Sequence, residues 1–335
     1  MANPRYLFPI LLCLLIATAV GTPLVGLVPV QWADVKSLFS DQPGPFWILR
    51  VPRLLMAMIA GASLSLAGVT FQAVFRNPLA TPYTLGVASG AALAASIAFA
   101  LGHTGLVVGI PILTLAAFTG AITSVLIVYA VASVRRGFST GTLLLAGVSI
   151  AFICSACILL IEYFSKLSVT NATVKWLMGS VEVAGIDPVL EAIFLAVIGM
   201  ALIWYLHKDL DLLLMGDLVA ASRGVNVRRS RRIAYFAASI VTAAVVAQTG
   251  PIGFVGLVVP HVMRFLVGPG HRRLIPASIL AGAIFLPVCD TLSRQVMWWI
   301  WRETLQIPVG ILTNLLGGVF FLGILLTRKQ ESPIA

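Results

Sequence analysis

Apolar runs recur along the whole chain, and this pattern constrains the fold more than any other feature. A helix needs about 20 predominantly apolar residues to cross a bilayer. Ten runs of roughly this kind can be marked between the polar segments. We therefore predict an all-α polytopic membrane protein with about ten transmembrane helices. The runs cover residues 7–30, 54–75, 83–101, 106–134, 140–163, 189–206, 233–248, 252–267, 274–292 and 305–327.

The composition points to the same class. Hydrophobic residues make up 59% of the 335 residues and charged residues only 10%, whereas soluble domains carry about 25% charged residues. A water-soluble chain of this length could not hide so much apolar surface. The net charge of +10 does not indicate a nucleic-acid partner, because the basic residues lie between the apolar runs. We expect contacts with membrane lipid and one transmembrane domain over residues 1–335.

The distribution of basic residues predicts the orientation. Starting in the cytoplasm and alternating the runs places 15 of the 22 lysines and arginines on the inner side, as the positive-inside rule requires. Both termini are then cytoplasmic, and Arg50, Arg53 and Arg294 lie outside. The inner group includes Arg135, Arg136, Arg328 and Lys329.

The first run allows two interpretations. It fits a cleaved signal peptide, with Arg5 as the charged start and residues 17–19 as the cleavage site. It also fits a retained span, because it continues past the usual length of a signal peptide and includes Pro23 and Pro29.

Residues 250–261 combine an apolar composition with three glycines and two prolines. Such residues free backbone groups, which inside a membrane need a partner from protein or from a water-filled cavity. We therefore expect a short, irregular helix that is buried among other helices.

The sequence shows no signs of an enzyme, a cofactor or a metal site. None of the five lysines follows a Walker A run. Cys154 and Cys157 have CxxC spacing, but small residues between them are typical of helix packing. The four histidines, including His103, do not cluster in the sequence.

Carboxylates are rare within the apolar runs. Only Asp290 and Glu162 are identified there, both near the ends of their runs. Asp290 and Arg294 are spaced for a local ion pair. A proton-driven carrier would be expected to show embedded carboxylates, so this pattern argues against one. A secondary transporter built from inverted repeats stays the alternative, because residues 50–54 and 272–276 each lead into Ala-Gly-Ala.

The longest polar stretch, residues 207–232, contains a candidate short helix that Asp217 can cap and Gly224 can end. A helix of two turns is unstable alone in water and must dock on something. The partner is either a protein or an anionic lipid surface. The apolar face would consist of Leu218, Val219, Ala221, Val225 and Val227, and the basic residues for lipid would be Arg228, Arg229, Arg231 and Arg232.

Arg50 and Arg53 flank Pro52 just before the second run. They either reach toward lipid headgroups or present positive charge to an acidic partner, which mainly affects encounter rate and register.

Several strings resemble the permease subunits of bacterial ABC importers for ferric siderophores, haem and vitamin B12. They follow the order of that family and cover almost the whole chain. The strings are Leu-Arg-Val-Pro-Arg-Leu at 49–54, the stretch 72–91, Leu-Ala-Gly-Val at 145–148, Trp-Leu-Met-Gly-Ser at 176–180, residues 250–261, and Pro-Val-Gly-Ile-Leu-Thr at 308–313.

The resemblance implies a ten-helix permease in a bacterial plasma membrane that pairs with an identical chain or a close paralogue. Two separate ATPase subunits bind its cytoplasmic face, and a periplasmic or lipid-anchored binding protein delivers the substrate. Residues 76–82 and 261–264 would support the ATPase-facing surface. The residues that the resemblance assigns to binding-protein docking are Arg50, Arg53 and Arg294. ATPase docking falls to Asp217, Leu218, Val219, Ala220, Ala221, Ser222, Arg223, Gly224 and Val225.

Overall fold

The computed structural model describes residues 4–26, 30–37, 44–102, 105–107, 109–134, 140–302 and 305–327. Arg135, Arg136, Arg328, Lys329 and His103 lie outside the described residues. The first half of the chain forms α1 (Pro4–Leu24), α2 (Trp32–Lys36), the π-helical η2 (Phe46–Arg50), α3 (Val51–Phe75), the 3-10 turn η3 (Tyr83–Leu85), α4 (Val87–Ala100), β1 (Leu106–Val107), β2 (Ile110–Pro111) and α5 (Ile112–Val134).

The second half is helical wherever it has regular structure in the described residues, and it includes the short helices at the membrane surface. Its elements are α6 (Thr140–Phe164), α7 (Leu167–Leu177), α8 (Asp187–Tyr205), α9 (His207–Met215), α10 (Asp217–Ser222), α11 (Val227–Thr249), α12 (Val255–Val267), α13 (His271–Trp301) and α14 (Val309–Thr327).

The predicted class is confirmed. Within the described residues, eight helices are long and apolar enough to span a bilayer, and α4 and α12 are shorter apolar helices. Together they account for the ten predicted runs. The run 106–134 differs in its first residues, where a two-stranded antiparallel hairpin precedes α5. Gly109, with φ of +82°, and Pro111 explain this difference, because a left-handed glycine and a proline favour a turn over a helix.

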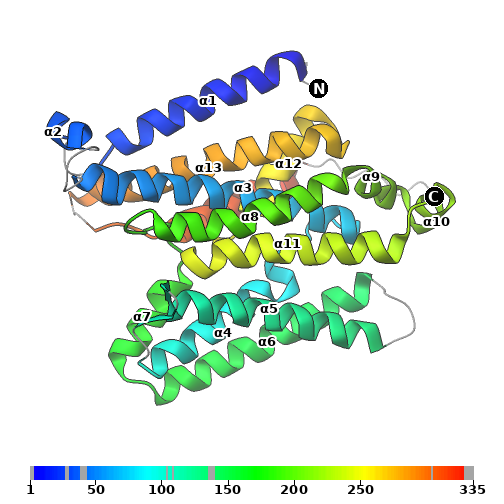
Figure 1. Ribbon diagram of the computed structural model, residues 1–335, viewed down its shortest axis with the longest axis horizontal. Coiled ribbons are helices and arrows are strands. Elements are labelled where there is room, and N and C mark those ends of the chain that lie inside the picture. Colours follow the sequence, from blue (N-terminus) through cyan, green and yellow to red (C-terminus); the bar gives the residue numbers. More distant parts are fainter. Residues whose placement is uncertain are drawn as a thin grey trace.

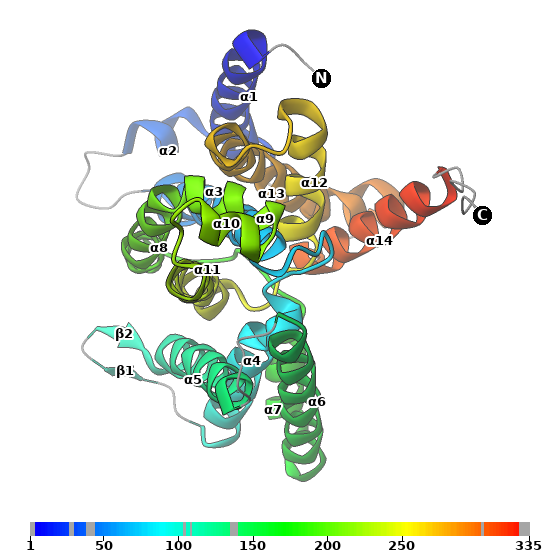
Figure 2. The same cartoon turned by 90° about the vertical axis from the view of Figure 1, so that its right-hand side faces the viewer.

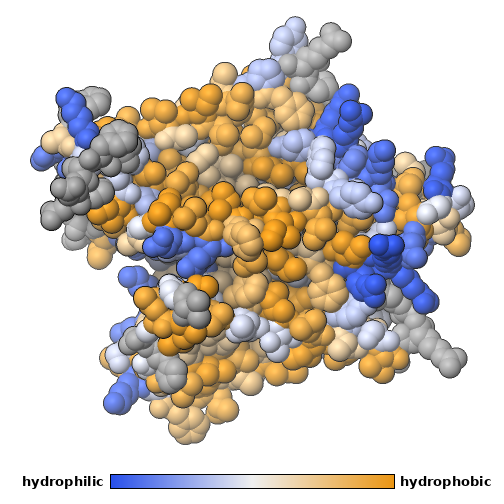
Figure 3. Space-filling model, in the orientation of Figure 1, coloured by the Kyte–Doolittle hydropathy of each residue, from blue (hydrophilic) through white to orange (hydrophobic). Residues whose placement is uncertain are grey.

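The long helices lie side by side (Figure 1). In Figure 1, α9 and α10 mark one end, called the α10 end below, and α2 and α7 mark the other, called the α7 end. Figure 3 shows hydrophobic residues across the middle and hydrophilic residues gathered toward both ends. This distribution fits a bilayer around the middle of the bundle.

Helix α3 forms the centre of the core, because most of its length is buried. At its crossing with α13, a Cβ added to Gly61 would lie 2.0 Å from the carbonyl oxygen of Gly282. At its crossing with α12, a Cβ on Gly68 would lie 1.8 Å from the carbonyl oxygen of Gly256. Small residues let membrane helices approach this closely. The two Ala-Gly-Ala stretches noted in the sequence therefore meet at the crossing of α3 and α13.

The helices form two groups. Figure 2, which faces the α10 end, shows α1, α3 and α8–α13 together, with α4–α7 beside them and α14 projecting on another side. Tyr235 of α11 is fully buried and stacks edge-on against Phe71 of α3, with 6.1 Å between ring centroids. The two groups are joined mainly through α11, which packs against both α3 and α5.

Candidate functional site

The short helix predicted in the polar stretch is present as α10, and it ends as predicted. Gly224 adopts φ of +83°. Its N–H donates to Ala221 at 3.0 Å, and the N–H of Val225 donates to Ala220 at 3.0 Å. These two bonds form the Schellman arrangement that satisfies the last carbonyls of a helix. At its other end, Gly216, with φ of +118°, separates α10 from α9.

The prediction that Asp217 caps α10 is wrong. The N-cap is Gly216, and no side chain caps the helix. The Asp217 carboxylate instead accepts from Arg231 of α11 at 2.7 Å and from Arg76, which follows α3. The Arg231 side chain is only 4% exposed, and a buried charge needs a partner. Asp217 therefore ties α10 to two long helices.

These two arginines also shift the titration of Asp217. Burial raises the pKa of Asp217, but Arg231 and Arg76 outweigh that effect and hold the pKa below its ordinary value. The carboxylate is therefore charged at neutral pH, and the link between α10, α3 and α11 stays intact.

One side of α10 is turned to solvent. Leu218 is 89% exposed, and Val219 is also exposed. Ala220 is fully buried. Val225 and Val227, which the sequence analysis placed on the same apolar face, instead pack against the core. They lie beyond the end of α10, so helical spacing does not apply to them. The remaining predicted docking residues, Ala221, Ser222, Arg223 and Gly224, are exposed.

Helix α9, which precedes α10 and packs against it, is anchored to α11 and α13 by contacts that the sequence analysis missed. Asp209 accepts from Ser230 of α11. Asp211 accepts from the backbone N–H of His271 at 2.8 Å and contacts its ring at 2.7 Å, which caps α13. Burial raises the pKa of Asp211, but the hydrogen bonds from His271 outweigh burial and lower it. In the sequence, the only sign of these contacts was the spacing of Asp209 and Asp211 within a polar stretch.

At the α7 end, two of the three predicted outer arginines, Arg53 and Arg294, bind one carboxylate. Asp290 of α13 accepts from Arg53 of α3, with 2.8 Å between Nη2 and Oδ1. It also accepts from Arg294 one turn later, at 3.2 Å from Nε to Oδ2, which confirms the predicted local pair. Arg53 further donates to Gln306 at 3.0 Å. Arg50 donates to the carbonyl of Pro23 at 2.9 Å.

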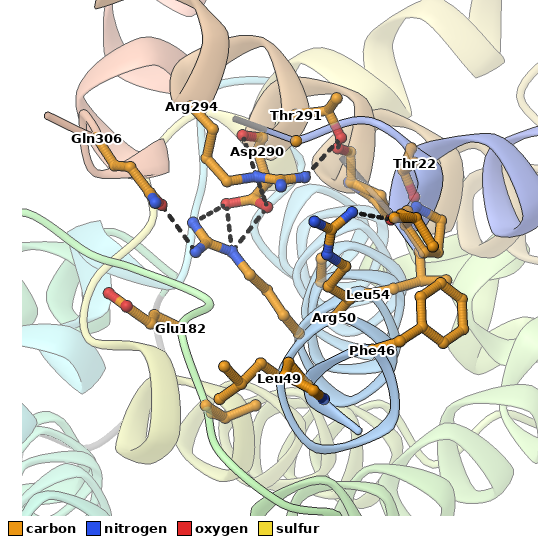
Figure 4. Close-up of a pocket in the computed structure, with 18 of the residues that line it drawn as sticks. Thr22, Phe46, Leu49, Arg50, Leu54, Glu182, Asp290, Thr291, Arg294 and Gln306 are labelled. Atoms are coloured by element: carbon orange, nitrogen blue, oxygen red, sulfur yellow. Dashed lines mark hydrogen bonds and ion pairs between the residues drawn. The ribbon is translucent and has the colours of Figure 1, made fainter. Parts of the chain in front are cut away.

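These arginines line a cavity of about 470 Å3 (Figure 4). Its walls come from α1, η2, α3, α13 and the segments around Glu182 and Gln306. The lining includes the acidic residues Asp34, Glu182 and Asp290, which offset Arg50, Arg53 and Arg294. In Figure 4, Glu182 lies across the cavity from Arg294. The cavity is therefore polar but balanced in charge.

Three of the recognised strings meet through their backbones. The N–H of Ser180 donates to Thr249 at 2.7 Å, and the N–H of Gly310 donates to Gly179 at 3.1 Å. A Cβ on Gly179 would lie 2.2 Å from the carbonyl oxygen of Pro251. Close backbone contacts of this kind exclude side chains. We call residues 176–180, 249–254 and 308–311 the glycine junction.

The prediction of a short irregular helix after Gly250 is confirmed. Residues 250–254 are not helical, and α12 begins at Val255 and contains Pro260. Phe254 adopts φ of +62° at the start of α12. Beside the junction lies a cavity of about 490 Å3, which α14 also borders through Asn314. Its other lining residues are Leu79, Thr81, Tyr83, Thr84, Leu177, Pro251, Gly253, Phe254 and Leu257.

A further embedded carboxylate was missed. Glu191 lies in the first turns of α8 and accepts from Gln248 of α11 at 2.6 Å. Gln248 in turn accepts from Thr114 of α5 at 3.3 Å. The charge stands alone in a long apolar run, and this isolation was the signal that could have singled it out. In the described residues, no group of histidines, cysteines and carboxylates could hold a metal ion.

Comparisons with known proteins agree with this architecture. The FecCD transport family matches residues 10–328. The hemin transport system permease protein HmuU of Yersinia pestis is 33% identical over 336 residues, with 98% of each chain covered. The cobalamin import system permease protein BtuC of Halobacterium salinarum is 38% identical over 284 residues, which cover 85% of this chain and 74% of that protein.

A solved structure has the same fold. It is described as an inward-facing conformation of a metal-chelate type ABC transporter. The TM-score is 0.84 at 29% identity, with 97% of this chain and 100% of that chain covered.

Together with these relatives, the ten apolar helices among the described residues and the short surface helix at one end identify a membrane transport permease. The chain belongs to the FecCD transport family. It is the permease subunit of an ABC importer, in the group that includes importers of iron chelates, haem and cobalamin. ATP hydrolysis lies in a partner subunit, and a binding protein is the other partner. The family assignment sets aside the alternative of a secondary transporter.

Proposed function

We propose that α10 and its C-terminal turn, residues 217–225, dock in the ATPase subunit. The observation that carries this proposal is a six-residue helix that holds its conformation while Leu218 is 89% exposed. A helix this short needs tertiary support, and α9 and Asp217 supply it. The exposed apolar side is then free for a partner.

The geometry also supports a route for motion. Asp217 links α10 to Arg76 at the end of the central helix α3 and to Arg231 at the start of α11. A displacement of α10 therefore acts on both helices. ATP must favour one orientation of the permease over the other for this link to drive transport.

We propose that the cavity around Asp290 receives the binding protein at the α7 end. Arg53 and Arg294 already share Asp290, so an acidic residue of the binding protein competes with this carboxylate there. Arg50 donates to the carbonyl of Pro23 and lines the same cavity. We assign the electrostatic contribution to docking to Arg50, Arg53 and Arg294 together.

We propose that two permease chains, identical or paralogous, enclose the path. Helix α14 borders the cavity at the glycine junction, and α6 packs on η3, which also lines that cavity. Only 17% of the apolar window of α6 and 22% of that of α14 are buried within one chain. A second chain would cover this surface and close the 490 Å3 cavity at the junction. The α10 end then faces the cytoplasm with both termini, in a bacterial plasma membrane, and residues 1–335 form one permease domain.

The cargo follows from the relatives, which carry hemin and cobalamin. We infer an iron chelate, haem or cobalamin as the substrate class. The test is uptake into proteoliposomes that contain the permease, its ATPase and its binding protein, with a panel of these compounds. We expect ATP-dependent uptake of one class, matched by binding to the binding protein. Uphill uptake by the permease alone, without nucleotide, would contradict the proposal.

A further inference from the structure

A third cavity lies at the α10 end, and none of its lining residues belongs to either proposed docking surface. Its volume is about 540 Å3, and it lies where α1, α12 and α13 meet. Figure 2 shows these three helices adjoining at the α10 end. We call it the α1/α13 cavity. Its lining residues are Phe8, Val267, Gly270, Arg272 and Arg273.

The cavity is cationic. Arg272 and Arg273 are both exposed, and among the described residues no carboxylate forms an ion pair with either. Both lie in the first turn of α13, which contains no acidic residue. Positive side chains at a helix N-terminus oppose the helix dipole. An anion bound here would interact favourably with the positive end of the helix dipole and would reduce the repulsion between the two arginines.

The protein supplies only part of that negative charge. Asp211 of α9 accepts from the backbone N–H of His271 in the same turn, but it does not line the cavity. The arginine side chains therefore face an opening without a carboxylate in its wall.

The helices that wall the cavity carry exposed apolar side chains. Helix α1 packs mainly on α13, and its residues Tyr6 and Ile10 are exposed on either side of Phe8 in sequence. Phe265 of α12 is also exposed. The arginines lie at the start of α13, at the polar end, while Phe8 and Val267 provide an apolar wall. Two charged side chains beside an apolar wall, at the end of a membrane-spanning helix, fit the interface between lipid headgroups and acyl chains.

We propose that the α1/α13 cavity binds the phosphate headgroup of an anionic phospholipid from the leaflet at the α10 end. Arg272 and Arg273 bind the phosphate, and Phe8 and Val267 contact the glycerol and the first carbons of the chains. Basic pockets between membrane helices bind anionic headgroups in this way. The lipid would then strengthen the packing of α1 on α13 and link α1 to α12.

The test uses the full-length permease in phosphatidylcholine nanodiscs with increasing phosphatidylglycerol, and native mass spectrometry counts the retained lipid. We expect Arg272→Gln/Arg273→Gln to weaken retention roughly fivefold per arginine, about 25-fold together. The matched control is Arg228→Gln/Arg229→Gln, because these exposed arginines also lie in the first turn of a helix without acidic residues. The control should retain the lipid within about twofold of wild type, given that surface charge off a site contributes little.

A second pair of variants tests the cavity without removing an arginine. Gly270 has φ of −68°, and a Cβ added there meets nothing within 4 Å. It is also the N-cap of α13, where Asp and Ser are favoured. Gly270→Asp should fold normally and abolish retention, because its carboxylate competes with the phosphate. Gly270→Ser should retain the lipid.

Three results would overturn the proposal. Equal losses in the two arginine pairs would show a diffuse surface charge. Displacement of phosphatidylglycerol by millimolar inorganic phosphate would show a site for a free anion. Loss of ATPase association in lipid-free detergent upon Arg272→Gln/Arg273→Gln would show that the partner subunit uses this surface. None of these results depends on which cargo is carried.

Discussion

Arg53 and Asp290 form an ion pair across 237 residues of sequence, with 2.8 Å between Nη2 of Arg53 and Oδ1 of Asp290. The pair joins the start of the central helix α3 to the last third of α13. The Asp290 side chain is only 5% exposed and the Arg53 side chain 15%. The region proposed for binding-protein docking is therefore also a structural connection at the α7 end.

Replacing Asp290 with Asn should destabilise the permease strongly. Two largely buried arginines would lose their shared carboxylate, and breaking a buried pair costs about 3–5 kcal/mol. The free energy of unfolding in detergent would measure this. Asp187→Asn is the control, since Asp187 lies at the same end, is exposed and forms no ion pair with any described residue. A loss no larger than in the control would show that the pair contributes little to folding.

Arg50→Glu should weaken binding-protein docking, because it reverses a positive charge that lines the proposed docking cavity. The effect should be largest at low salt, because added salt screens exposed charges with a Debye length of about 10 Å at 0.1 M. Surface binding at increasing ionic strength would measure it. Lys175→Glu on α7 is the control for net charge, since Lys175 is exposed at the same end. Unchanged docking at low salt would favour contacts of Arg50 with lipid headgroups.

The sequence predicts the helices well because burial in lipid leaves a long and regular signal. The segment after Gly250 was predictable for the same reason, since glycine and proline in an apolar run require a protected backbone. The partners of the charged residues could not be predicted from the sequence. In the sequence, local spacing favours Asp217 as a helix cap. In the structure, Asp217 instead binds Arg231 and Arg76, which only tertiary packing brings near. Glu191 and Gln248 lie 57 residues apart and meet for the same reason.

The glycine junction should tolerate no side chain. Gly179 and Gly185 both have left-handed backbones, with φ of +72° and +76°. A Cβ on Gly179 would lie 2.2 Å from a carbonyl oxygen, whereas a Cβ on Gly185 meets nothing within 4 Å. Gly185→Ala should cost only the left-handed conformation, about 1–2 kcal/mol. Gly179→Ala should cost more, with loss of folded protein after size-exclusion chromatography. Equal effects would mean that the junction can relax.

The link through Asp217 should depend on pH in one direction. Because the folded pKa of Asp217 lies below its ordinary value of 3.8, the ion pairs contribute stability above that value, and this stability is lost as pH falls through the folded pKa. The difference in unfolding free energy between wild type and Asp217→Asn should therefore be constant from about pH 7 to pH 5 and shrink below about pH 4. A difference that grows on acidification would contradict this assignment.

Leu218→Asp should abolish ATPase association while leaving the permease folded. Leu218 is 89% exposed in the permease, so its replacement removes no internal contact, but burial of a leucine in a partner groove contributes roughly 1.5–3 kcal/mol. Losing this hydrophobic contribution and burying a carboxylate in its place should lower the affinity for the ATPase by more than about tenfold. Co-purification of the ATPase with the tagged permease measures the effect. Leu167→Asp is the matched control, because Leu167 is 75% exposed at the start of α7, at the opposite end. If both variants retained the ATPase, α10 would not be the docking helix, and the solvent-facing leucine would then belong against headgroups of the lipid surface.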